Sequence, residues 1–163
     1  MFRVGERIAH PMHGAGVIEG IEERLVDGRR ESYYALRLLS GGLRLLVPVS
    51  AAGSLGLRPT AGKEKLDRLL RSIPALDPRM EQNWNRRYRE NMDRLRTGDL
   101  TELARVIKGL SLRDRETGLS TGERKMLWSA KQILLSEIQL TEDVTCDEAE
   151  RMLSRALEER PAE

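Results

Sequence analysis

The chain has 163 residues, of which 39% are apolar and 33% charged, with a net charge of +2 and a single cysteine. No apolar run approaches the roughly 20 residues of a membrane span, so composition excludes a transmembrane protein. One cysteine excludes an internal disulfide framework, and the N-terminal stretch lacks the apolar segment of a secretory signal, so we expect a cytoplasmic protein.

Charge is unevenly distributed along the sequence. Residues 1–58 carry 8 basic and 6 acidic groups, residues 63–128 carry 16 and 11, and residues 129–163 carry 4 and 9. A basic segment inside a nearly neutral protein indicates a local contact with a polyanion. The alternative is a solvated helical surface with surplus arginine, and charge alone does not decide between them.

The first 58 residues predict short strands. The candidate strands are RVGERIAH, AGVIEGIEERL, ESYYALRLL and LRLLVPVS, separated by the turn-forming segments PMHGAG, VDGRR and SGG. Asp27-Gly28 predicts a hairpin turn, because such a turn needs the positive φ that glycine tolerates. Short strands joined by tight turns hide their edges by curling, so we expect a small SH3- or Tudor-like antiparallel β-barrel. Its expected core is Val4, Ile8, Val17, Ile21, Tyr34, Leu36, Leu38, Leu45 and Val47.

After residue 58 the pattern changes from strand to helix. Helical spacing and capping signals predict five helices, near residues 63–73, 77–98, 99–112, 120–141 and 145–159. The last four begin at candidate N-caps, Asp77, Asp99, Ser120 and Thr145, and the last three of these have Glu three residues later. We therefore predict an α+β protein with two domains. The first is the barrel at 1–58, and a linker at 59–62 joins it to an all-α bundle of about five helices at 63–163.

Groups suited to catalysis are few. His10 and His13 lie in a Pro/Gly-rich turn and lack the further ligands that a zinc site needs. Cys146, at a helix start, has no histidine near it in sequence. Phosphate-binding, dinucleotide-binding and nucleophile-elbow motifs are absent from the sequence. We therefore expect a protein that is not an enzyme and that uses no metal or cofactor.

The stretch NWNRRYREN, residues 83–91, raises the functional question. Residues 79–96 hold six arginines against three acids, and Trp84 lies among them. Trp84 also belongs to one helical stripe with Met80, Tyr88, Met92 and Leu95, which is typical of a core face. This spacing favours core packing, but an aromatic residue between arginines is also a moderately specific signal of a nucleic-acid contact. From the residues alone, both interpretations stay open.

The second tryptophan is interpreted differently. Trp128 lies with Leu127, Ile133 and Leu134 in an apolar helical segment, so we expect it to pack in the core or between helices. Lys125, with Arg124, lies near the start of the same helix and is a candidate phosphate contact.

Several longer segments resemble the CarD family (CarD/CdnL-like) of bacterial RNA polymerase-binding regulators, over nearly the whole chain. The segments are FRVGERIAHPMHGAGVIEGIEER, LLVPV, NWNRRYRENMDRL followed by GD, and RDRETGLSTGERKMLWSAKQILLSEI. Their order and spacing match the family.

The resemblance implies a two-part transcription regulator. The Tudor-like domain would dock on the RNA polymerase β subunit, and the helical domain would contact promoter DNA at the upstream edge of the −10 element. Trp84 would wedge into the minor groove, and Arg86, Arg87 and Arg89 would hold the backbone. Such contacts would stabilise the open complex. The resemblance implies no cofactor, no membrane partner and little sequence specificity, and we expect a monomer.

The docking residues implied by the resemblance show one departure from the family. Arg24 matches a position used in polymerase docking, but Leu46 stands where relatives often carry a basic residue, with Arg44 two residues earlier on the same strand face. The rival hypothesis is a protein–protein adaptor without DNA contact, in which Trp84 is a core residue. A second rival is a metal hydrolase built on His10 and His13.

Overall fold

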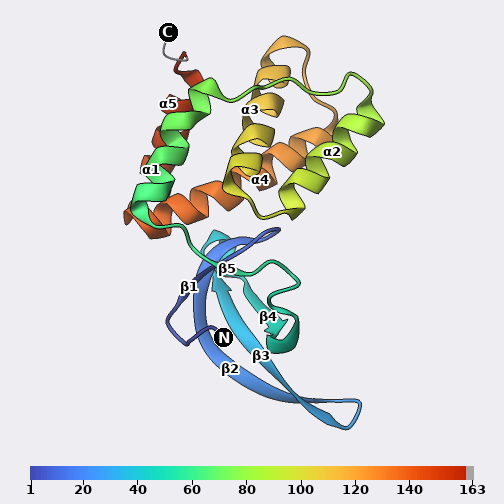
Figure 1. Ribbon diagram of the computed structural model, residues 1–163, viewed down its shortest axis with the longest axis vertical. Helices are drawn as coiled ribbons and strands as arrows, with labels where there is room; N and C mark the ends of the chain where they lie inside the picture. The colour runs from blue at the N-terminus through green and yellow to red at the C-terminus, as the bar shows by residue number, and fades with distance from the viewer. Residues whose placement is uncertain (161–163) are drawn as a thin grey trace.

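The computed structural model describes residues 1–160, in which a sheet domain and a helical domain lie end to end (Figure 1). The strands are β1 Arg7–His10, β2 Gly14–Val26, β3 Arg29–Leu38, β4 Arg44–Pro48 and β5 Arg58–Pro59. The helices are α1 Lys63–Ser72, α2 Trp84–Arg96, α3 Leu100–Glu116, α4 Thr121–Glu142 and α5 Cys146–Glu158. The predicted α+β class is confirmed. The exact domain boundaries stay a prediction, and residues 161–163 of the predicted bundle lie outside the described residues.

The sheet is antiparallel, with strand order β4-β3-β2-β1-β5. Its core is made by residues from every part of the domain, namely Ile8, Ile18, Tyr34, Leu36, Leu38, Val47, Ala52 and Leu57. The predicted hairpin turn is confirmed, because Asp27 and Gly28 have φ of 50° and 77° and Val26 pairs with Arg29. β4 and β5 form the two edges of this sheet.

Three predicted core positions of the sheet domain are wrong. Val4 precedes β1, which begins at Arg7, and is exposed. A register shift in β2 between Ile18 and Gly20 inserts an extra residue, so the alternation reverses there and Ile18 is buried instead of Val17. Ile21 pairs with Tyr34 but is 46% exposed, since the β2–β3 hairpin extends beyond the rest of the domain (Figure 1).

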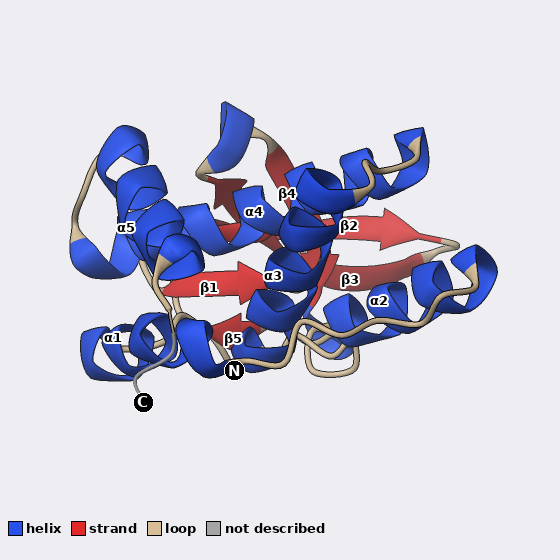
Figure 2. Ribbon diagram, turned by 90° about the horizontal axis from the view of Figure 1, so that it is seen from above, coloured by secondary structure: helices blue, strands red, loops and turns tan. Residues whose placement is uncertain are grey.

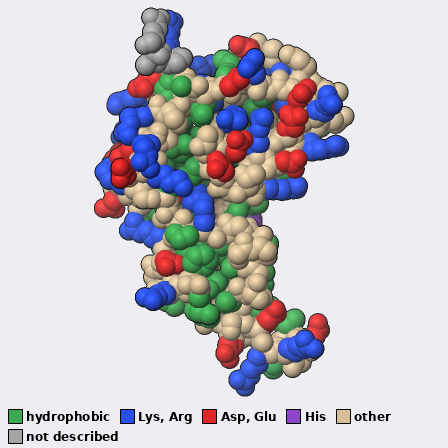
Figure 3. All heavy atoms as spheres, in the orientation of Figure 1, with side chains coloured by type: hydrophobic (Ala, Val, Ile, Leu, Met, Phe, Trp, Pro, Cys, Tyr) green, Lys and Arg blue, Asp and Glu red, His purple; other side chains and the backbone are tan. Residues whose placement is uncertain are grey.

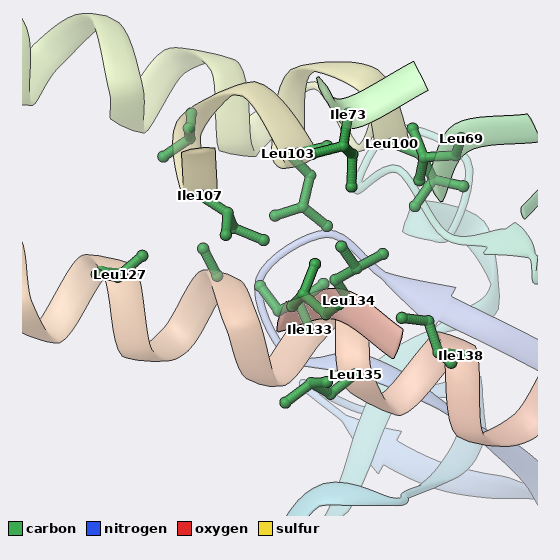
Figure 4. Packing of buried hydrophobic residues seen from close by; sticks show 14 of the residues in the cluster. Leu69, Ile73, Leu100, Leu103, Ile107, Leu127, Ile133, Leu134, Leu135 and Ile138 are labelled. Carbon is green, nitrogen blue, oxygen red and sulfur yellow. The ribbon is translucent and has the colours of Figure 1, made fainter. Parts of the chain in front are cut away.

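The helical domain has a separate core, formed mainly by α3 and α4 with contributions from α1 and α5 (Figure 4). Three predicted helix starts are confirmed by their caps. The side chains of Asp99, Ser120 and Thr145 accept hydrogen bonds from the backbone N–H groups of Glu102, Glu123 and Glu148, at 3.0, 3.2 and 3.1 Å. Each bond satisfies a backbone donor that the first turn of a helix leaves free.

The predicted start of the second helix is wrong by six residues, because the N-cap is Asn83 and not Asp77. Asp77 does not cap a helix. Its carboxylate accepts from the backbone N–H of Arg79 at 2.9 Å and pairs with the Arg79 guanidinium. Residues 77–83 instead run along α3, where Met80 lies so close to Gly109 that a Cβ there would stand 2.1 Å from the methionine Cε. The helix starts at Trp84, with Asn83 as its N-cap.

A buried ion pair joins the two domains. The carboxylate of Glu137, on α4, accepts from both terminal nitrogens of Arg58, on β5, at 2.8 and 2.9 Å, and from the backbone N–H of Ala61 at 2.8 Å. Beside it, Ser136 accepts a hydrogen bond from the backbone N–H of Ala15 on β2 at 2.9 Å. Viewed from above, the helices lie over the strands (Figure 2), and these bonds fix α4 against the sheet domain.

No helix within residues 1–160 is long and apolar enough to cross a bilayer.

Candidate nucleic-acid interface

Trp84 is held at the surface by contacts from α2 and α4. It is the first residue of α2 and is 43% exposed. One face of its indole stacks on Tyr88, with ring centroids 5.1 Å apart and an angle of 19° between the planes. Its Nε1–H donates to the Ser120 hydroxyl at 2.9 Å, and both rings lie against Gly122 of α4. The structure therefore contradicts the interpretation of Trp84 as a core residue.

The support beneath Trp84 is a buried ion pair. Arg87 on α2 donates from Nε and a terminal nitrogen to the two carboxylate oxygens of Glu123 on α4, at 2.7 and 3.1 Å. The two side chains are only 3% and 2% exposed. The other terminal nitrogen of Arg87 donates to the carbonyls of Glu81 and Gln82, which fixes the loop entering α2.

The structure therefore corrects the expectation that Arg87 contacts a DNA phosphate. Its guanidinium is buried and bonded to Glu123 and to two carbonyls, so it is not available to a DNA backbone. Arg87 is instead linked to Trp84 by hydrogen bonds through Glu123 and Ser120. Glu123 also accepts from the Ser120 hydroxyl at 3.2 Å, and that hydroxyl accepts from Trp84. A continuous network thus runs from the buried pair to the exposed indole.

The Arg87–Glu123 pair also changes the pKa of the glutamate. Hydrogen bonds from the Arg87 guanidinium lower the pKa of Glu123 below its usual range, against the opposing effect of burial. The carboxylate is therefore ionised near neutral pH and the pair is intact there.

Several exposed cations lie on α2 and at the start of α4, and two of them share a groove with Trp84. Arg86 and Arg89 are exposed, and Arg89 and Arg96 line a shallow groove together with Trp84, Tyr88 and Met92. Lys125 is exposed on the second turn of α4. On the face seen in Figure 3, Lys and Arg side chains gather mainly over the helical domain. Of the predicted DNA contacts, the structure brings Trp84, Arg86 and Arg89 onto one helix and places Lys125 on its neighbour.

The inward side of α2 agrees with the expected packing. On α2 Leu95 is buried and Met92 half-buried, and Met80, in the segment before α2, is also half-buried; both methionines pack against the helical core. Trp128 does not follow its prediction, because it is 64% exposed on the outside of α4 while Leu127, Ile133 and Leu134 are buried.

The predicted docking residues gather on one face of the sheet. Arg44 on β4 and Arg24 on β2 both bond the carboxylate of Glu22, and Arg44 also bonds Glu19 at 2.8 Å. These bonds, from Arg44 first, lower the pKa of Glu22. Leu46 is half-buried on β4, two residues after Arg44. The shared carboxylate orders two cations at the surface beside this apolar side chain.

His10 forms a hydrogen bond within its own turn, next to His13. The Nδ1 atom of His10 accepts from the backbone N–H of Met12 at 3.0 Å, and burial together with the neighbouring His13 lowers the pKa of His10 to about 4. Among residues 1–160, no group of three or more His, Cys, Asp or Glu side chains is placed to hold a metal ion.

Comparison with known proteins agrees with this two-part architecture. The family model of the CarD C-terminal domain matches residues 68–154, and that of the CarD-like/TRCF RID domain matches residues 2–61. The chain belongs to the CarD family. A relative from Bacillus subtilis (strain 168), named "Putative transcription factor YdeB", is 32% identical over 145 residues, which cover 89% of this chain and 95% of the relative.

CarD-family membership supports a transcription-related role that involves interaction with RNA polymerase. The family is generally non-enzymatic.

Sequence reasoning missed the residues that position Trp84. The spacing of Ser120 and Glu123 predicts a capping box, in which the glutamate side chain bonds the backbone N–H of the cap residue. In the structure the serine still caps α4, but the Glu123 carboxylate binds Arg87 on another helix. The only signal in the sequence is the acidic Glu123 in the first turn of α4. Its partner, Arg87, lies 36 residues earlier in the chain.

Proposed function

We propose that this CarD-family protein docks on the RNA polymerase β subunit through its sheet domain and stabilises the promoter open complex through its helical domain. The DNA contact is at the upstream edge of the −10 element, with Trp84 as a wedge in the minor groove. The observation that carries the proposal is the ordered exposure of Trp84 among arginines.

The setting of Trp84 suits a wedge. A side chain that enters a base step must be apolar, rigid and open on its outer side, because disorder in the free protein would have to be removed on binding. Tyr88, Ser120 and Gly122 restrain the indole before any DNA arrives. The wedge can therefore act on DNA without first being ordered.

The cations around the wedge suit a backbone contact. Arg89 lines the same shallow groove as Trp84, Arg86 is exposed on another side of α2, and Lys125 is exposed on the adjacent helix. Guanidinium groups bind phosphate oxygens in bidentate fashion and read no base sequence. Affinity for DNA would then fall with salt and depend little on sequence.

Such contacts favour one state of the promoter over another. Unstacking a base step requires about a few kcal/mol, and this is smaller where the DNA is already distorted or melted. A wedge therefore binds the open complex better than closed DNA and shifts the population toward it. Docking through the sheet domain raises the local concentration of Trp84 at the promoter.

The test of this proposal is the lifetime of promoter open complexes. We expect Trp84→Ala to shorten the lifetime toward its value without the protein, because a stacked aromatic contributes about 1–3 kcal/mol, or roughly 5- to 150-fold. Dissociation after competitor challenge measures it. Trp84→Phe, which retains an aromatic ring, is expected to keep part of the effect. Unchanged lifetimes with Trp84→Ala, in a protein that still binds polymerase, would exclude the wedge.

Docking on the β subunit is tested separately. We expect Arg44→Glu to weaken binding to purified polymerase by about tenfold or more, since it removes a cation and places a third acid beside Glu19 and Glu22. Arg68→Glu, the same change at an exposed position of α1, is the matched control and should bind normally. Equal binding by both variants would show that this face of the sheet is not the docking surface.

A further inference from the structure

Trp128 is the most exposed aromatic residue for which the fold provides no internal partner. It is 64% exposed, although it lies in a helix whose other large apolar side chains are mostly buried. Its neighbours on the helix surface, three and four residues away, are Arg124, Lys125, Lys131 and Gln132. The indole is thus surrounded by three cations and an amide.

On the outer face of α4 Arg124 and Lys125 are exposed, while Lys131 is half-buried in a groove with Asp114 and Glu158. Between residues 121 and 136 the only acid is Glu123, which is buried and bonded to Arg87. Within the described part of the chain, Arg124, Lys125 and Lys131 form no salt bridge. An exposed aromatic residue beside exposed cations complements a polyanion.

This surface is continuous with the setting of Trp84. The rings of Trp84 and Tyr88 lie against Gly122 at the start of α4. At 3.6 residues per turn, Ser129 and Lys125 lie between Gly122 and Trp128 around the helix. Trp128 is six residues beyond Gly122, about 9 Å along the axis, which corresponds to roughly three base pairs of DNA.

We propose that Trp128 and Arg124 form a second DNA contact that extends the Trp84 site along α4, a role that rests on the proposed function above. The Trp128 indole packs on the sugar–phosphate backbone and donates its N–H to a phosphate oxygen. Arg124 binds the adjacent phosphates, with Lys125 between the two tryptophans. The wedge then acts at one end of a strip that holds the duplex a few base pairs away.

Site-specific photo-crosslinking tests this contact in the complete assembly of full-length chain, polymerase and labelled promoter. With a benzophenone amino acid at position 128, we expect crosslinks to DNA within a few base pairs of those formed from position 84. The same group at Glu150, exposed on the acidic helix α5, should label no DNA. Labelling of a polymerase subunit only, or of nothing, from position 128 overturns the proposal.

The two proposals fail in different ways. DNA labelling from position 84 without labelling from position 128 would leave the wedge intact and exclude the second contact.

Trp128→Ala is expected to shorten open-complex lifetime by at least about fivefold. Arg124→Gln, which leaves Lys125 in place, should make the plot of log affinity against log salt less steep by about 1. Because these side chains are exposed, thermal unfolding should be unchanged. An unchanged lifetime and salt slope would again overturn the second contact.

Discussion

Replacing Arg87 with methionine is expected to lower the free energy of unfolding by about 3–5 kcal/mol, the usual effect of removing one partner from a buried ion pair. Glu123 would then be left buried beside the Ser120 hydroxyl and an apolar side chain. The carbonyls of Glu81 and Gln82 would also lose their donor. Urea or thermal unfolding at neutral pH measures the change.

The matched control is Arg89→Met, two residues away on the exposed side of α2. It should change unfolding by no more than about 0.5 kcal/mol, because exposed substitutions rarely do more. In open-complex assays, however, Arg89→Met should shorten the lifetime through a lost phosphate contact. The two variants therefore separate an arginine that stabilises the fold from one that is proposed to bind DNA. The same loss of stability from both variants would contradict this assignment.

The pH dependence gives an independent check on the Arg87–Glu123 pair. In the native chain the pKa of Glu123 is lowered on folding, so its contribution to stability is present above the usual glutamate range and is lost as pH falls through the folded pKa. Without Arg87, burial raises the pKa of Glu123, so the sign reverses. The difference in stability between native chain and Arg87→Met should be largest near neutral pH and shrink in acid. A difference independent of pH would mean that Glu123 is not the group affected.

Arg58→Leu is expected to lower the free energy of unfolding by about 3 kcal/mol, near the lower end for a broken buried pair. Glu137 is fully buried and keeps only its bond from Ala61, while Arg58 is partly exposed. Amide hydrogen exchange at Ala61 and Ala15 should also accelerate, because both N–H groups bond α4 at the domain junction. The double variant Arg58→Leu, Glu137→Leu should recover part of the loss.

The control for Arg58 is Arg30→Leu near the hairpin tip, where the ion pair with Glu23 is exposed and 3.9 Å long. This change should have almost no effect on stability. Under the proposed function the sheet domain docks and the helical domain contacts DNA, so loss of the junction should also affect activity. A looser junction lowers the effective concentration of Trp84 at the promoter, so open complexes should shorten in lifetime. Normal exchange at Ala61 in Arg58→Leu would show that the pair does not fix the domains.

The sequence alone determined the elements whose causes are local. The Asp27-Gly28 turn and the caps at Asp99, Ser120 and Thr145 depend on residues within four positions of one another, so they could be predicted directly. The change from strand to helix pattern likewise predicted the two-domain class. Helix α2 was placed too early because Asp77 and Pro78 form a good local start signal that packing on Gly109 overrides.

Only the tertiary structure decided which charged and aromatic side chains are exposed and available to a partner. Arg86, Arg87 and Arg89 look alike in sequence, yet Glu123 lies 36 residues beyond Arg87 and removes that arginine alone from the surface. Periodicity placed Trp84 and Trp128 on apolar stripes, but a stripe is buried only where another element covers it. Nothing within residues 1–160 covers Trp128, and Tyr88, Ser120 and Gly122 cover only part of Trp84. Burial depends on contacts between distant segments, which a single sequence does not specify.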